Sequence, residues 1–134
     1  MSHSPLSLIL AVHLSVVLGP SAGSLSAAAE VDFARDIRPI LAGKCFHCHG
    51  PDDATREGDL RLDTRESLLA VDPGRAIIVA GHSVESRVFQ RLVSNDPDER
   101  MPPPASKLTL SPGEIDLVRR WIDEGAAWQG HWSL

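Results

Sequence analysis

Cys45 and Cys48 are the two cysteines of this 134-residue chain, and His49 directly follows the second one. This Cys-x-x-Cys-His spacing is the attachment signature of a c-type haem. Two intervening residues on a helical turn present both sulfurs to one edge of a porphyrin, where they can add to its two vinyl groups. The imidazole of His49 then lies beneath the iron as an axial ligand. The sequence therefore predicts one covalently attached haem c with its iron.

Three other interpretations of the cysteine pair leave more of the sequence unexplained. A structural zinc site needs four ligands, usually from two spaced pairs, and only the scattered His82 and His131 could complete it. A thioredoxin-like site needs a βαβ context, whereas the residues before Cys45 have a helical pattern. A plain disulfide would close a loop too small to constrain the unfolded chain much. Haem attachment is therefore the favoured interpretation.

A second candidate ligand lies in the stretch 94–110, where the segments 95–98 and 101–104 contain four prolines. A structureless loop of this length is uncommon inside a compact domain unless it has a function. Its one residue with useful coordination chemistry is Met101, whose thioether is a soft axial ligand that raises the reduction potential of a haem. We therefore favour Met101 as the second axial ligand over a methionine that fills a gap in the core. His82 is a weaker alternative ligand.

Helices on both sides should position these residues. Four apolar residues recur at helical spacing before the motif: Phe33, Ile37, Ile40 and Leu41. Pro39 cannot donate a backbone N–H, so this helix should kink or restart there. After the proline-rich stretch, Ser111 is the predicted N-cap, Pro112 the first helical residue and Glu114 the partner in a capping box. The apolar stripe of this helix is Ile115, Val118, Trp121 and Ile122, and Gly125 should end it.

Shorter elements are predicted between the motif and the proline-rich stretch. Residues 54–59 have the composition of an exposed polar loop. Asp63 and Glu66 fit a capping box for a helix that should run to Ala70. A turn is predicted at 72–74.

Two apolar segments around that helix have the pattern of short strands. Residues 60–62 alternate and residues 76–79 are rich in β-branched side chains, so we expect them to form at most one short β pair. A further helix should open at 81–83 and bury one apolar face. That face is formed by Val84, Val88, Phe89 and Leu92.

The first 29 residues contain no Lys, Arg, Asp or Glu. An apolar run at 6–18, followed by small residues that end at Ala29, predicts a secretory signal peptide cleaved near that alanine. The run is shorter than the ~20 residues of a membrane-spanning helix, so no stable membrane span is expected. The predicted layout is a signal peptide at 1–29, one haem domain at 30–128 and a short tail at 129–134. We expect an exported, periplasmic or extracytoplasmic protein.

The net charge of −5 and the absence of a basic run exclude a strongly basic surface that would bind nucleic acid. No nucleophile elbow, phosphate-binding loop or paired catalytic carboxylates are recognisable. The many acidic residues are most simply a solvated surface. Composition therefore favours a binding or carrier protein over an enzyme, and its oligomeric state is not determined by the sequence.

The whole pattern resembles a class I cytochrome c, and most closely the cytochrome c domain of planctomycete proteins. The resembling stretches are 33–50, 80–86, 100–104 and 108–128. The resemblance implies a small, mainly α, single-domain fold in which the N- and C-terminal helices cross beside the haem, carried by Cys45 and Cys48. It assigns the axial positions to His49 and Met101. Such domains usually head longer chains, so 129–134 resembles a truncated junction to a further domain.

The sequence leaves three functions open, two that depend on haem and one that does not. With both axial positions filled, the protein would be a one-electron carrier that serves unidentified redox proteins. If Met101 does not reach the iron, an open distal site would suit a ligand-binding or peroxidase-like protein. Without haem, the chain would be an interaction module in which Cys45 and Cys48 form a disulfide or a zinc clip.

Overall fold

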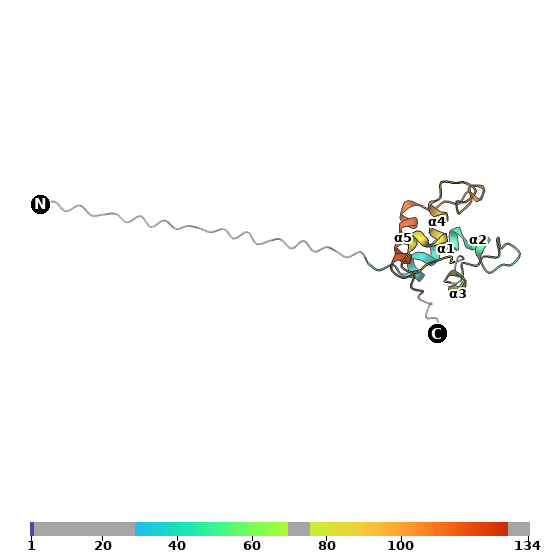
Figure 1. The fold of residues 1–134 in the computed structure, drawn as a ribbon, viewed down its shortest axis with the longest axis horizontal. Coiled ribbons are helices and arrows are strands. Elements are labelled where there is room, and N and C mark those ends of the chain that lie inside the picture. Colours follow the sequence, from blue (N-terminus) through green and yellow to red (C-terminus); the bar gives the residue numbers. More distant parts are fainter. Residues whose placement is uncertain (2–28, 70–75, 129–134) are drawn as a thin grey trace.

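The computed structural model describes residue 1 and residues 29–69 and 76–128. This part of the chain folds into helices joined by loops and has no strand, which confirms a mainly α fold (Figure 1). The elements in order are η1 (Phe33–Ile37), α1 (Arg38–Lys44), α2 (Phe46–His49), α3 (Arg65–Leu68), η2 (Ser83–Glu85), α4 (Arg87–Val93), η3 (Pro104–Ser106) and α5 (Pro112–Asp123). The predicted signal peptide up to residue 28, the end of the helix at Ala70, the turn at 72–74 and the tail 129–134 lie outside the described residues.

The helical segment before the motif restarts at Pro39, as the sequence predicted. Asp32 accepts a hydrogen bond from the backbone N–H of Arg35 at 2.8 Å and caps η1, a short π-helix. The chain then continues into α1, with Pro39 in the first positions of that helix. A proline is tolerated there because the first N–H groups of a helix have no intrahelical partner. After α1 the chain passes through Cys45 directly into α2.

The predicted C-terminal helix α5 is confirmed with its capping box. The Ser111 hydroxyl accepts a hydrogen bond from the N–H of Glu114, and the Glu114 carboxylate accepts one from the N–H of Ser111. Pro112 occupies the first position of the helix. Gly125 follows the helix with a φ of +105°, which favours glycine, and turns the chain back.

Helices α5 and η1 pack together and join the two ends of the domain (Figure 1). Phe33 stacks on Trp128 with ring centroids 3.8 Å apart and also contacts Trp121 at 5.4 Å. Ile37 and Ile122 are fully buried beside them. The tryptophans at 121 and 128 are therefore packing residues, and this core holds the N-terminal unit against the C-terminal helix.

The predicted β pair between 60–62 and 76–79 is not formed. The N–H of Leu62 donates to the carbonyl of His49 at 2.8 Å instead. In the second segment, the N–H of Val79 donates to Ser86 Oγ, and the carbonyl of Ile77 accepts from the N–H of Val88. These backbone groups are occupied, so the expectation of paired strands was wrong.

The capping box predicted at Asp63 is also wrong. Both carboxylate oxygens of Asp63 accept hydrogen bonds from the guanidinium of Arg61, at 3.0 and 2.6 Å. Thr64 is the N-cap of α3 instead, because its side chain accepts from the N–H of Ser67. A carboxylate held by an arginine fork is not free to cap a helix.

The predicted helix after residue 81 is divided in two. Ser86 lies between η2 and α4, is fully buried, and its hydroxyl donates to the carbonyl of His82 at 2.9 Å. Val84 is 71% exposed, so its predicted place on the buried face was wrong. Val88, Phe89 and Leu92 of α4 do pack against the core as predicted. Within the described residues, no helix is both long enough and apolar enough to cross a bilayer.

Candidate functional site

The motif residues Cys45, Cys48 and His49 lie together on one helical turn. The N–H groups of Cys48 and His49 both donate to the carbonyl of Cys45, at 3.1 and 2.8 Å. The Cys45 N–H donates to the carbonyl of Leu41 at 2.8 Å, which connects this turn to α1. Both thiols are partly buried, and neither is in a disulfide. The chain therefore presents two available sulfurs from a fixed backbone.

The surroundings of the Cys45 thiol disfavour its charged thiolate form. Burial, and secondarily the neighbouring Cys48, raise the pKa of the Cys45 thiol to about 11. Redox-active and metal-binding cysteines work as thiolates and have lowered pKa values. The raised pKa therefore argues against the thioredoxin-like interpretation of this pair. The described residues also contain no group of three or more His, Cys, Asp or Glu that could hold a metal, as the zinc interpretation would require.

His49 carries a polar atom whose partner is missing from the protein. Its Nδ1 is the one buried side-chain nitrogen or oxygen, among the described residues, without a hydrogen-bond partner. Buried polar groups in folded proteins almost always have a partner, so such an atom marks an incomplete site. Two unpaired thiols and this imidazole on the same turn fit a group that binds through two sulfurs and one ring nitrogen.

The loop that follows the motif folds back on it. The carbonyl of Cys48 accepts from the N–H of Glu57, and that of His49 from the N–H of Leu62, both at 2.8 Å. The next two carbonyls, of residues 50 and 51, accept from the Nε and Nη2 of Arg56 at 3.1 and 3.0 Å. Four consecutive carbonyls are thus held by the segment 56–62. We call this set of four bonds the carbonyl clamp.

Sequence reasoning missed Arg56. Residues 54–59 were expected to form an exposed polar loop, but the side chain of Arg56 is only 12% exposed. It forms ion pairs with Asp53 and, at 3.9 Å, with Asp59. The signal in the sequence is a single arginine with an acidic residue three positions away on each side, five residues after the Gly-Pro pair that follows the motif.

Gly50 ends the motif turn because no larger residue fits. A Cβ at this position would overlap the backbone carbonyl of Phe46. Its backbone is extended, with φ −110° and ψ −162°, so the requirement comes from close approach and not from a left-handed conformation. Gly50 thus lets the chain leave the turn immediately after His49.

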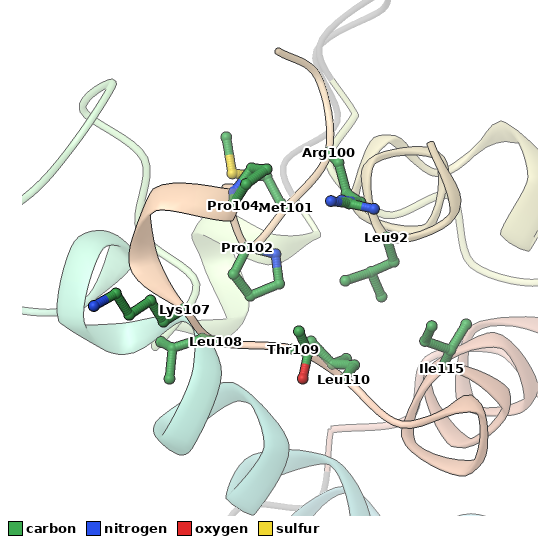
Figure 2. Close-up of a pocket in the computed structure, with 10 residues that line it drawn as sticks. All are labelled: Leu92, Arg100, Met101, Pro102, Pro104, Lys107, Leu108, Thr109, Leu110 and Ile115. Carbon is green, nitrogen blue, oxygen red and sulfur yellow. The ribbon is translucent and has the colours of Figure 1, made fainter. Parts of the chain in front are cut away.

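Met101 lies in the other predicted part of the site, beside a cavity of about 380 Å³ (Figure 2). The cavity is lined by Leu92 of α4, Ile115 of α5 and residues of the loop 100–110, which includes a single 3₁₀ turn at η3. The Met101 side chain is 36% exposed, and its thioether points away from Leu108, Leu110 and Ile115 (Figure 2). The backbone N–H of Met101 donates to the carbonyl of Arg91 at 3.0 Å.

The cavity beside Met101 is not lined by all of the predicted ligands. The cavity lining includes Met101 but none of the three motif residues. The alternative ligand His82 is 62% exposed at the side chain and lies 3.8 Å from the carboxylate of Glu85. The pairing of His49 with Met101 as axial ligands therefore stays a prediction.

Comparison with known families identifies the class of this domain. Residues 45–105 match the family model described as Planctomycete cytochrome C. The matched region begins at the first motif cysteine, includes the carbonyl clamp and extends past Met101. No curated protein and no solved structure matches the chain. The match supports a planctomycete-type cytochrome c domain, as the sequence predicted, and this family implies binding of haem c.

Proposed function

We propose that this protein is a mono-haem c-type cytochrome that transfers single electrons and is not itself an enzyme. Cys45 and Cys48 would hold the haem through thioethers, and His49 and Met101 would be its axial ligands. The observation that carries the proposal is the motif turn, where two unpaired thiols lie beside an imidazole with an unpartnered, buried nitrogen. The family match supports the same cofactor.

A haem bound here would supply an iron that takes up and releases one electron, and the chain would set its environment. Attachment through two sulfurs leaves the thiols no further reactivity, and the imidazole of His49 donates a nitrogen lone pair. Partial burial of Cys45, Cys48 and His49 limits contact with water. Solvent exclusion around such a site is one of the factors that tune a reduction potential.

The exposure of Met101 supports its assignment as a ligand. A methionine that fills a gap in the core would be buried, whereas this side chain is 36% exposed. Its backbone is fixed at one end by the hydrogen bond to Arg91 and at the other by the prolines that follow. The backbone of Met101 is thus constrained while its side chain has no packing role in the core, which leaves the sulfur available as a ligand.

We further propose export, with function in the periplasm or another extracytoplasmic compartment. Thioether attachment of haem takes place outside the cytoplasm in bacteria, and the uncharged, apolar start of the chain has the composition of a signal peptide. The electron donors and acceptors would be other redox proteins. A net charge of −5 does not favour nucleic acid as a partner.

The deciding experiment is expression of the full chain together with a cytochrome c maturation system. A pyridine haemochrome assay on the purified protein should report one covalent haem per chain, and voltammetry should show a reversible one-electron wave. Protein that is folded but carries no covalent haem would refute the cofactor. Haem without a reversible wave would refute the carrier function.

The cavity beside Met101 supports a second candidate, a haem-based ligand-binding or peroxidase-like protein. A cavity of about 380 Å³ lies within the usual range for small-molecule sites, and Met101 is not directed into it. This function requires that the Met101 sulfur leaves the iron open. Rapid and complete binding of carbon monoxide to the reduced protein at neutral pH would favour it, whereas no binding would favour the carrier.

A further inference from the structure

We propose that Arg56 is the positioning residue for His49, the predicted proximal ligand of the haem iron. By closing the carbonyl clamp, it fixes the orientation of the His49 imidazole and thereby the electronic state of a haem iron bound to it. This inference rests on the proposed function and adds a residue that neither the motif nor the family match assigns.

The motif turn needs external support. Helix α2 has only four residues, Phe46–His49, and one helical turn is not stable by itself in water. The last carbonyls of a helix have no intrahelical partners. Here the carbonyls of Cys48 and His49 accept from the N–H groups of Glu57 and Leu62. The orientation of His49 therefore depends on a segment that begins seven residues further along the chain, at Arg56.

Arg56 holds that segment in place. Its Nε and Nη2 donate to the carbonyls of Gly50 and Pro51, the two residues that connect the motif to the loop. A planar guanidinium can reach two neighbouring acceptors at once, whereas the single ammonium group of a lysine cannot reproduce that fork. Asp53 pairs with the same Nη2 that donates to the carbonyl of Pro51, and Asp59 pairs with Nη1. Nε donates to the carbonyl of Gly50.

The burial of Arg56 shows that this arrangement is part of the fold. Its side chain is 12% exposed, while those of Asp53 and Asp59 are 87% and 100% exposed. Exposed ion pairs contribute little to stability, so the bonds to the two carbonyls are the main interaction. Interactions that orient a metal-bound histidine tune its metal. Arg56 would act through the backbone that follows His49, because its hydrogen bonds go to the carbonyls of Gly50 and Pro51 and not to the imidazole ring.

The test uses the haem-loaded full-length protein and three variants. Arg56→Gln removes both the fork and the charge, and Arg56→Lys removes the fork but keeps the charge. Arg61→Gln is the matched control, because the guanidinium of Arg61 donates to the carboxylate of Asp63 and, among the described residues, makes no hydrogen bond to the motif. The readouts are the haem-methyl NMR shifts of the ferric protein, which report imidazole orientation, the midpoint potential, and amide exchange at Glu57 and Leu62.

We expect the haem-methyl shift pattern to change in both Arg56 variants, and the amide hydrogens of Glu57 and Leu62 to exchange about tenfold faster. Both readouts should stay unchanged in Arg61→Gln. The midpoint potential should move in both Arg56 variants. If only the charge mattered, Arg56→Lys would match the unmodified protein in every readout, and the inference would be overturned. Wild-type shifts in haem-loaded Arg56→Gln would overturn it as well.

The failures of the two proposals are distinguishable by the haem content of the unmodified protein. If that protein takes up no covalent haem, the proposed function fails and this inference fails with it. If it does carry haem, only the comparison among variants decides the role of Arg56. Should Arg56→Gln not fold, the conservative Arg56→Lys variant decides the question alone.

Discussion

The two halves of the predicted haem site are built in opposite ways. Around His49, the backbone is closed by four consecutive carbonyl acceptors, and the exit at Gly50 permits no larger residue. Around Met101, the backbone N–H donates to the carbonyl of Arg91, whose guanidinium in turn donates to the carbonyl of Glu99. Met101 itself is 36% exposed, and a cavity lies alongside.

This difference indicates which ligand the protein prepares before the cofactor is bound. The motif turn has few alternative backbone conformations, because the carbonyls that follow it all have hydrogen-bond partners. The loop that carries Met101 can adjust its side chain at little cost to the rest of the fold. We therefore expect attachment and proximal ligation to depend on the motif turn, and the choice between electron carrier and ligand binder to depend on the loop.

The largest effect should come from removing the thiols. In the double variant Cys45→Ala and Cys48→Ala, covalent haem should be lost completely, because no sulfur remains to add to a vinyl group. His47→Ala is the control, since His47 is exposed on the same turn and should leave attachment unchanged. Pyridine haemochrome assays of the purified proteins measure both. Covalent haem in the double variant would disprove the role of the motif.

The next largest effect should follow Met101→Ala, and it should be confined to the distal side. Covalent haem should be retained, the far-red iron–sulfur absorption band should disappear, and carbon monoxide should bind rapidly to the reduced protein. In the haem-free protein, where Met101 is 36% exposed, the free energy of unfolding should fall by less than about 1 kcal/mol. Val84→Ala, at an apolar residue that is 71% exposed, is the control.

Two outcomes would contradict this prediction in different ways. Retention of the far-red band in Met101→Ala would assign the distal position to another ligand. A large loss of stability in the haem-free protein, measured by urea denaturation, would mean that Met101 packs as a core residue, and the contrast between the two halves would no longer hold.

Gly50→Ala should test how rigid the motif turn is. The new Cβ would overlap the carbonyl of Phe46, so the backbone must shift, at a cost of about 1–3 kcal/mol in the free energy of unfolding. Gly43→Ala is a matched control in α1, where a Cβ meets nothing within 4 Å. That change should stabilise the protein by up to about 1 kcal/mol, because alanine favours helix over glycine. Urea denaturation of both variants measures the difference in their free energies of unfolding. Equal values would mean that the backbone at Gly50 shifts at little cost and that the motif turn is not rigid.

The smallest effect should lie outside both halves, at Asp123 of α5. Its carboxylate accepts hydrogen bonds from the N–H of Ser83 at 3.0 Å and from Arg119 at 3.2 Å. These partners, the Ser83 bond first, lower the pKa of Asp123 below its ordinary value of 3.8. A lowered folded pKa means that the stabilisation is complete above that ordinary value and is lost as the pH falls through the folded pKa.

Asp123→Asn should therefore lower the free energy of unfolding at neutral pH by less than about 1 kcal/mol, since the carboxylate is partly exposed to solvent. The difference from the unmodified protein should shrink as the pH falls below 3.8. Asp98→Asn is the control, at an exposed carboxylate in the proline-rich loop. A difference that grows in acid would contradict the assignment. Haem content should not change in either variant.

Much of the fold could be predicted because its signals are local. The restart at Pro39, the capping box at Ser111 and the end of α5 at Gly125 each depend on residues within one or two turns of each other. The failed predictions involve competition for the same group. Asp63 is a good N-cap by type, but Arg61 takes both of its carboxylate oxygens.

The amino-acid sequence by itself determined the cysteine–histidine motif, the class of the domain and its two framing helices, because covalent spacing and helix signals act over short distances. Tertiary structure alone decided that Arg56 turns inward to the carbonyls after His49, and that the cavity beside Met101 excludes the motif residues. Those outcomes depend on which buried donors and acceptors meet when distant segments pack. Local composition does not encode that pairing, which is why a polar loop in the sequence became the support of the motif turn.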